Sequence, residues 1–195
     1  MHSWKNATPI SNNSLNSPEP MDPNKTHESF AHALISRTQT LSHIIPPELD
    51  FFGPLIGHWD IEYVDGLGTP GERHVRGEWI FSRVLAGTAI QDVFICPSRE
   101  QWEISPQADA EYGTTIRIYN PVSRAWDVFY GCTGAAVRLE ARREENDIVL
   151  TEVTMGRMRW IFSDIAAASF HWQNTERMDD GTVRINCEVF ATRRK

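Results

Sequence analysis

The sequence predicts an all-β protein, an antiparallel up-and-down barrel of about ten strands preceded by a short N-terminal helix. From Gly57 onward, short runs alternate between apolar and polar residues with period two, and turn residues separate them at intervals of roughly 8–14 residues. No part of the chain alternates strands with helices, the pattern that would predict a parallel sheet. An open meander of ten strands would leave two exposed edges, so we expect the sheet to close into a barrel.

Two segments precede the predicted barrel domain, which spans residues 51–195. Residues 1–25 are rich in Asn, Ser and Pro and have few large apolar side chains, so they are predicted to be a disordered tail. Residues 26–50 are predicted to be a helix and linker, with Thr26 as the helix cap and Pro46 at its end. We expect this helix to act as a lid or brace on the barrel.

Ten strands are expected in the barrel domain, most of them joined by tight turns such as Asp179-Asp180-Gly181. One connection, from Pro97 to Glu111, is long and polar. The expected strands are Trp59–Val64, His74–Ser82, Thr88–Cys96, Thr114–Asn120, Ala125–Tyr130, Ala135–Arg143, Asp147–Met155, Arg157–Asp164, Ser169–Arg177 and Thr182–Thr192.

Alternation along each strand predicts which side chains point into the barrel. In the fourth strand we expect Ile116 and Ile118 to face inward and Arg117 outward; with the opposite parity, Arg117 would be a candidate anion clamp. The other strands are expected to place inward Val75, Gly77, Trp79, Phe81, Trp126, Val128, Tyr130, Val137, Leu139, Ala141, Met158, Trp160, Phe162, Phe170, Trp172, Val183, Ile185, Cys187 and Val189.

This interior, walled by indole rings with a few polar groups, is typical of a small-molecule site. A ten-stranded barrel is also wider than the eight-stranded kind that side chains can just fill. The candidate ligand-binding residues are Tyr63, Trp79, Asp92, Trp126, Tyr130, Trp160, Trp172, Asn174 and Glu176. The sequence therefore favours binding of a hydrophobic or aromatic small molecule. The alternative is a filled barrel that serves as a scaffold or dimerisation domain.

A cofactor-free isomerase or cyclase built on the same cavity is a second alternative. Asp92 or Glu176, if buried among indole rings, would have a raised pKa and could act as acid or base. Glu176 has a competing interpretation, a solvated position at the barrel mouth near Arg177 and Arg184. Sequence motifs of hydrolases, nucleotide-binding loops and zinc peptidases are missing, so binding is favoured over catalysis.

Composition and spacing limit the partners and the compartment. A net charge of −7 argues against nucleic acid. Three cysteines without a CxxC spacing argue against a disulfide framework and a zinc site, and favour a reducing, cytoplasmic location. No metal or cofactor is expected: His171, the one strand-interior candidate for a haem ligand, has outward parity. We expect no membrane partner, and a homodimer is left open.

The first strand opens with Gly57-His58-Trp59, which resembles the start of lipocalin-type barrels. Further segments resemble a bacterial family of uncharacterised calycin-like barrel proteins, namely Gly77–Phe81, Leu85–Gly87, Gln91–Phe94, Tyr112–Pro121, Arg159–Asp164 and Ser169–Trp172. The resemblance covers nearly everything after Leu49 and implies a calycin, lipocalin-like fold. It also implies that Trp59 plugs the closed end, with Arg193 lying across its ring as a cation–π partner. It implies no activity.

Overall fold

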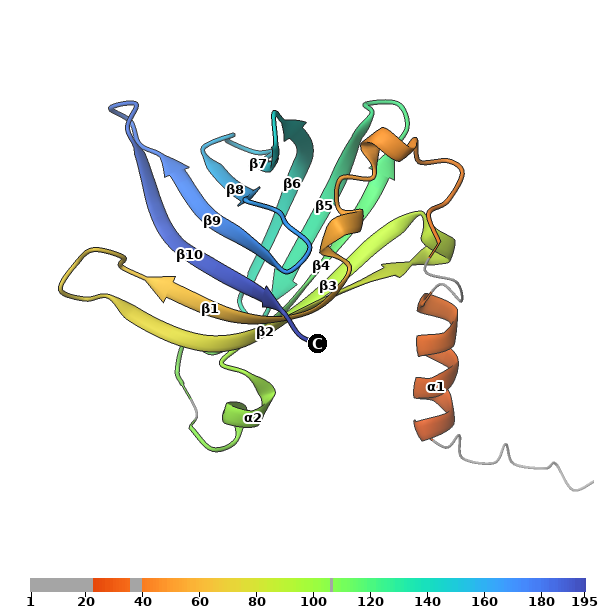
Figure 1. The fold of residues 1–195 in the computed structure, drawn as a ribbon, viewed down its shortest axis with the longest axis horizontal. Helices are drawn as coiled ribbons and strands as arrows, with labels where there is room; N and C mark the ends of the chain where they lie inside the picture. Colours follow the sequence, from red (N-terminus) through yellow and green to blue (C-terminus); the bar gives the residue numbers. More distant parts are fainter. Residues whose placement is uncertain (1–22, 36–39, 106) are drawn as a thin grey trace, which may run out of the picture.

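The computed structural model describes residues 23–35, 40–105 and 107–195, and it confirms an all-β barrel of ten antiparallel strands (Figure 1). Each strand pairs with its sequence neighbours, and β1 closes the barrel against β10. The strands are β1 (Gly57–Asp65), β2 (Arg73–Val84), β3 (Ala89–Cys96), β4 (Glu111–Asn120), β5 (Ala125–Cys132), β6 (Ala135–Glu144), β7 (Asp147–Glu152), β8 (Met158–Ser163), β9 (Ser169–Arg177) and β10 (Val183–Arg193).

The expected strands agree with the observed ones except near a few ends. Strand β4 begins at Glu111, three residues earlier than expected, and β7 ends at Glu152 rather than Met155. The turns follow local chemistry. The side-chain oxygen of Asn120, for example, accepts hydrogen bonds from the backbone N–H groups of Val122 and Ser123 after β4.

Helix α1 (Pro23–Leu34) differs from the prediction at both ends. It begins three residues before Thr26, which is therefore not its cap, and it ends well before Pro46. In Figure 1 it stands beside the barrel, to which Ile35 is joined by an isolated bridge with Val84. It does not cover an end of the barrel as a lid, and this contact with the barrel wall is the position expected of a brace. Of the predicted disordered tail, residues 1–22 lie outside the described residues and 23–25 belong to this helix.

One end of the barrel is filled by the segment between α1 and β1, with its 3-10 turns Pro47–Leu49 and Gly53–Leu55. We call residues 45–56 the plug. Its buried apolar side chains are Ile45, Phe51, Phe52 and Leu55. Two barrel indoles bond to its backbone: the Nε1 of Trp59 donates to the carbonyl of Leu55 at 2.7 Å, and that of Trp126 donates to Leu49 at 2.9 Å.

Arg193, near the end of β10, locks the plug in place. Its guanidinium lies 4.0 Å from the ring centroid of Trp59, which is the cation–π contact that the lipocalin resemblance implied. The same guanidinium donates to the backbone carbonyls of Pro54, Ile56 and Ala167, each at 2.7 Å. One side chain thus ties together the plug, the first strand, the last strand and the β8–β9 connection.

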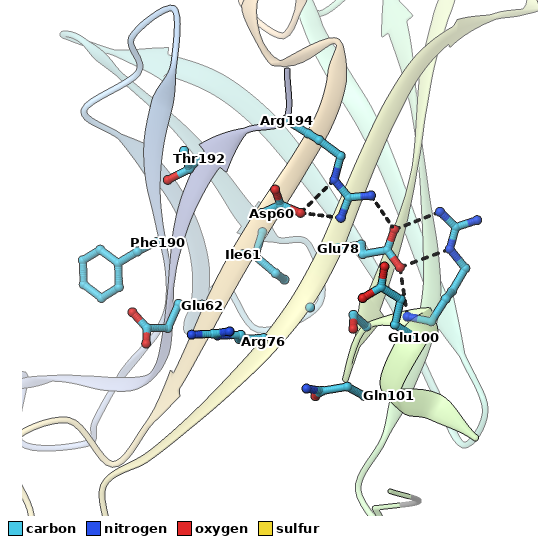
Figure 2. A pocket seen from close by; sticks show the side chains of 13 residues that line it. Asp60, Ile61, Glu62, Arg76, Glu78, Glu100, Gln101, Phe190, Thr192 and Arg194 are labelled. Carbon is cyan, nitrogen blue, oxygen red and sulfur yellow. Dashed lines mark hydrogen bonds and ion pairs between the residues drawn. The ribbon is translucent and has the colours of Figure 1, made fainter. Parts of the chain in front are cut away.

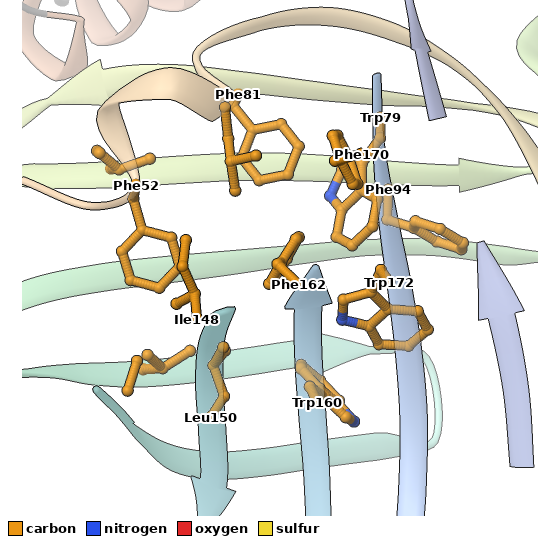
Figure 3. Packing of buried hydrophobic residues seen from close by; sticks show 14 of the residues in the cluster. Phe52, Trp79, Phe81, Phe94, Ile148, Leu150, Trp160, Phe162, Phe170 and Trp172 are labelled. Carbon is orange, nitrogen blue, oxygen red and sulfur yellow. The ribbon is translucent and has the colours of Figure 1, made fainter. Parts of the chain in front are cut away.

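Aromatic rings dominate the interior next to the plug residue Phe52 (Figure 3). Trp79 packs edge-on against Phe94 and Trp172, with centroids 5.2 and 5.7 Å apart and interplanar angles of 86° and 88°. Phe162 and Phe170 complete the cluster around it. Perpendicular contacts of this kind match the ring quadrupoles and stabilise a single arrangement.

The predicted parity of β4 is wrong. Arg117 points into the barrel and is 1% exposed, whereas Ile118 lies on the outer face and is 37% exposed. The inward set is therefore Gly113, Thr115, Arg117 and Tyr119, in register with inward residues of β3 and β5. The physical reason is a buried carboxylate on β3, described below, that forms an ion pair with this arginine of the neighbouring strand.

The predicted orientation is also wrong for the start of β10. A register shift between Ile185 and Cys187 inserts one extra residue, and this β-bulge reverses the faces of the residues before it. Val183 and Ile185 are consequently 61% and 49% exposed instead of buried. Cys187 and Val189, after the bulge, keep their inward positions.

Candidate functional site

A cavity of about 270 Å³ occupies the half of the barrel away from the plug. Its walls come from the ends of β1, β3, β5 and β9 and the beginnings of β4, β6, β8 and β10, together with Trp79 from the middle of β2. The lining residues are Tyr63, Trp79, Phe94, Glu111, Thr115, Tyr130, Val137, Met158, Trp160, Trp172, Asn174 and Cys187. Most of this wall is apolar, and half of its members carry aromatic rings.

Three of these rings are indoles whose N–H groups lack an acceptor. The Nε1 atoms of Trp79, Trp160 and Trp172 are buried, and within the described residues none has a hydrogen-bond partner. An unsatisfied buried donor costs about 1–3 kcal/mol, a cost that Phe would avoid. The indoles of the closed end, Trp59 and Trp126, both donate to the plug. The open half therefore holds indole rings at a cost to stability.

Glu111 is the carboxyl group of the cavity wall. Its Oε1 accepts a hydrogen bond of 2.5 Å from the hydroxyl of Tyr130 on the adjacent strand. Burial raises the pKa of Glu111 above its ordinary value, the Tyr130 hydrogen bond opposes this, and the charge of Asp92 adds to it. Gly113 makes the contact possible, because a Cβ there would lie 2.9 Å from the Tyr130 ring.

Tyr63 and Cys187 lie on the other side of the cavity, on the paired strands β1 and β10. Burial raises the pKa of the Cys187 thiol to about 11. Burial also raises the pKa of Tyr63, and that of Tyr130, well above the ordinary value for a tyrosine. All three groups are therefore neutral at pH 7, and Glu111 is the cavity group whose charge changes most readily.

Asp92 and Arg117 lie one layer deeper, toward the plug, and do not line the cavity. They form an ion pair of 2.5 Å between side chains that are 0% and 1% exposed. The guanidinium also faces the rings of Phe52 and Phe81, at 5.0 and 5.3 Å from their centroids. Asp92 is thus engaged by a permanent cation, which leaves it poorly suited to the acid or base role considered from the sequence.

Six of the nine sequence-predicted site residues lie together on the cavity wall. These are Tyr63, Trp79, Tyr130, Trp160, Trp172 and Asn174. Besides Asp92, two others lie elsewhere. Trp126 is completely buried against the plug. Glu176 is 37% exposed and pairs with Arg184 at 2.7 Å, the solvated mouth position that was its competing interpretation.

Sequence reasoning missed Glu111 as a site residue, because it was placed at the end of the long loop rather than in β4.

The outward direction expected for His171 is confirmed: its Nε2 lies 2.9 Å from Glu188, and its ring stacks on Phe190 on the outer surface. None of the histidines within the described ranges lines the cavity. The part of the chain that the structure describes contains no group of three or more His, Cys, Asp or Glu side chains that could hold a metal ion.

A larger, shallow hollow of about 920 Å³ lies outside the barrel, between β1, β2, β10 and the short helix α2 (Arg99–Trp102) (Figure 2). Its centre is Glu78, whose carboxylate accepts hydrogen bonds from the side chain and backbone N–H of Arg99 at 2.8–3.1 Å. These hydrogen bonds, with a smaller one from His58, lower the pKa of Glu78 to about 2. Arg194 pairs with Asp60 beside it. The central charges of this hollow pair with one another, and the Glu78–Arg99 contact fastens α2 to the barrel, so the interior cavity is the stronger candidate.

No protein-family model matches the chain, and a search of curated proteins found no match either. Among solved structures, the crystal structure of Rv2717c from M. tuberculosis is similar, with a TM-score of 0.50 and 11% sequence identity. The similarity covers 77% of this chain and 99% of that one. It supports the barrel fold alone. None of the helices within residues 23–35, 40–105 and 107–195 is long and apolar enough to cross a membrane.

Proposed function

We propose that this protein binds a compact small molecule, mainly aromatic or apolar, inside the open half of its barrel. The cavity of about 270 Å³ is slightly smaller than the roughly 300–1,000 Å³ typical of small-molecule sites. That size suits one or two rings rather than a long acyl chain. As part of the same proposal we place the protein in the reducing cytoplasm, which its three unpaired cysteines support.

The observation that carries this proposal is the contrast among the buried indoles. A barrel that served only as a scaffold would gain stability by filling its interior with Phe or Leu, which have no polar atom to satisfy. Here Trp79, Trp160 and Trp172 line unfilled space, and their buried N–H groups have no acceptor among the residues that the structure describes. Departures of this kind from optimal packing concentrate at functional sites.

Catalysis is the second candidate, and the Glu111–Tyr130 pair favours it. A carboxyl with a raised pKa in an apolar cavity, held by a tyrosine hydroxyl, can exchange a proton with a bound molecule. Glu111 would then take the acid–base role considered for Asp92 and Glu176. Binding remains the primary proposal, because it needs nothing beyond the cavity itself.

Native mass spectrometry of the protein purified from its own host tests the proposal. The expected result is a retained molecule of small mass that is released when the protein unfolds. Fluorescence titration with a panel of one- and two-ring compounds is the complementary experiment, since three of the seven Trp side chains line the cavity. An empty protein that also fails to respond to the whole panel contradicts the proposal and favours the scaffold alternative.

A further inference from the structure

We infer that the cavity selects a compact organic cation, a protonated amine or quaternary ammonium group on a small apolar body, held by Glu111 and the surrounding rings. The inference rests on the proposed binding function and adds the charge class of the ligand.

The charges on the cavity wall carry the first step. Glu111 is the single Asp or Glu among its lining residues, and they include no Lys, Arg or His. The wall is therefore neutral or negative at any pH near 7. An anionic ligand would be buried beside a carboxyl group without a counter-charge, which is strongly unfavourable. A bound cation would instead supply the positive counter-charge that the lining residues do not give to Glu111.

The rings carry the second step. Tyr130 and Trp160 meet at 82° with centroids 5.2 Å apart, and Trp160 and Trp172 meet at 66° and 5.8 Å. Trp79 is perpendicular to Trp172 in turn. These rings, set at steep angles to one another, line one cavity. Aromatic rings grouped around one space are a common means of binding ammonium groups.

A third step comes from the layer directly beneath the cavity. There the guanidinium of Arg117 lies 5.0, 5.3 and 6.0 Å from the ring centroids of Phe52, Phe81 and Phe162, and Asp92 balances its charge. This barrel interior therefore already holds one buried cation with aromatic rings and one carboxylate. The cavity repeats the rings and the carboxyl group, but its lining residues supply no cation.

The surroundings of Glu111 outside the cavity are also not positive. A small pocket of about 40 Å³ shares Tyr63, Phe94 and Glu111 with the cavity. The one Lys or Arg among its lining residues, Arg73, pairs with Asp109 and lies 3.7 Å from Asp65. Carboxylates therefore outnumber cations beside Glu111, which favours the approach of positively charged molecules.

The charge of Glu111 makes the selectivity depend on pH. The titratable or charged groups around it are Tyr130 on β5, Asp92 and Cys96 on β3, Tyr63 on β1, Cys187 on β10, Arg73 on β2 and Asp109 before β4. Since burial raises the pKa of Glu111, cation binding strengthens as pH rises through that value. A quaternary ammonium probe keeps its charge throughout, so the protein alone sets the change.

The test compares benzyltrimethylammonium with neopentylbenzene, its neutral isostere, and with the anion phenylacetate, by tryptophan fluorescence of the full chain. We expect the cation to bind about tenfold more tightly than the isostere and phenylacetate to bind most weakly. Glu111→Gln should weaken cation binding about tenfold and leave neopentylbenzene within about twofold. The control Glu176→Gln, at the solvated mouth, should change neither.

The outcomes separate this inference from the binding proposal. If neopentylbenzene binds at least as tightly as the cation, the charge class is wrong and the binding function stands. If neither the three probes nor a wider panel of neutral compounds changes the tryptophan fluorescence, both the cation selectivity and the binding function are wrong. Tyr130→Phe gives an independent check, because it removes a hydrogen bond that favours the carboxylate. The pH midpoint of cation binding should rise in this variant, and an unchanged midpoint contradicts the role of Glu111.

Discussion

Tryptophan and carboxylate side chains have different partners in the two halves of the barrel. In the plugged half, Trp59 and Trp126 donate to backbone carbonyls, and the carboxylate Asp92 is paired with Arg117. In the open half, the indole N–H groups have no acceptor within the described residues, and Glu111 is held by a neutral tyrosine. In the plugged half the buried indoles have acceptors and the buried carboxylate faces a cation, whereas in the open half three buried indoles without an acceptor among the described residues line a cavity.

This contrast shows where stability and function reside. The plugged half closes the barrel through contacts that bridge distant parts of the chain, above all those of Arg193. That rigid base allows the open half to keep unfilled space and unpaired polar groups, which a marginally stable domain could not otherwise tolerate. Substitutions in the two halves should therefore have opposite consequences for stability and ligand binding.

The largest effect is expected from breaking the buried ion pair. Arg117→Met should destabilise the protein by about 3–5 kcal/mol, because it leaves the carboxylate of Asp92 buried without a partner. Urea denaturation measures this loss. The matched control is the double variant Asp92→Leu/Arg117→Met, which removes both charges and should recover most of the stability. If Arg117→Met is as stable as the parent protein, the Asp92 carboxylate is not destabilising without its partner, and this account of the ion pair is wrong.

Matched tryptophan substitutions compare the two halves directly. Trp126→Phe removes the donor to Leu49, whereas Trp160→Phe removes an N–H without an acceptor. We expect Trp126→Phe to cost about 1–3 kcal/mol more than Trp160→Phe, since only the first leaves a carbonyl unsatisfied. Thermal unfolding of both variants decides it. Equal losses would remove the distinction between the halves.

Glu78, on the outer surface, should stabilise the folded protein more at neutral pH than at acidic pH. Its pKa is lowered from 4.5 to about 2 by Arg99, so its stabilisation is present above pH 4.5 and is lost as pH falls toward 2. Glu78→Gln should therefore cost about 2 kcal/mol at pH 7 and little below pH 2. A cost that stays constant across this range would mean that the carboxylate charge is unimportant.

Glu111 should show the opposite dependence. Its folded-state pKa is raised above the ordinary 4.5, so its contribution is fully present below that pH and is lost as pH rises through the folded value. Relative to the parent protein, Glu111→Gln should accordingly become more stable as pH increases above 4.5. Denaturation curves across this range measure the trend. A difference that falls with pH would mean that Glu111 is paired like Glu78.

The smallest effect is expected at Glu176. Its ion pair with Arg184 is partly exposed, and such pairs contribute about 0–1 kcal/mol. Glu176→Gln should leave both stability and ligand binding nearly unchanged, as measured by unfolding and fluorescence titration. A clear loss of binding would return Glu176 to the site and weaken the assignment of Glu111.

Much of the fold could be predicted because alternation and turn chemistry are local properties. The inward faces of β2, β5, β6, β8 and the first half of β9 follow directly from period-two patterns, which also predict the three indoles of the cavity wall. Strand β4 was misjudged because Ile116 and Ile118 outweigh a single arginine in a hydrophobicity pattern. The overlooked signal was Asp92, since a carboxylate placed inward requires a cation on a neighbouring strand.

Other features depend on pairing between strands, which the pattern of one strand does not contain. The bulge before Cys187 is set by the register of β10 against β9, and it reverses Val183 and Ile185. Glu111 joined the site because β4 extends three residues into a polar segment. Its pairing with Cys96, at the end of β3, fixes that extension.

The most direct test of the account is the NMR spectrum of the indole N–H groups during titration with benzyltrimethylammonium and with neopentylbenzene. Replacement of single tryptophans by phenylalanine assigns each resonance. We expect the signals of Trp79, Trp160 and Trp172 to shift with bound probe while those of Trp59 and Trp126 stay in place. Shifts centred on Trp59 and Trp126, or no shift with either probe, would contradict an open half built to hold a ligand.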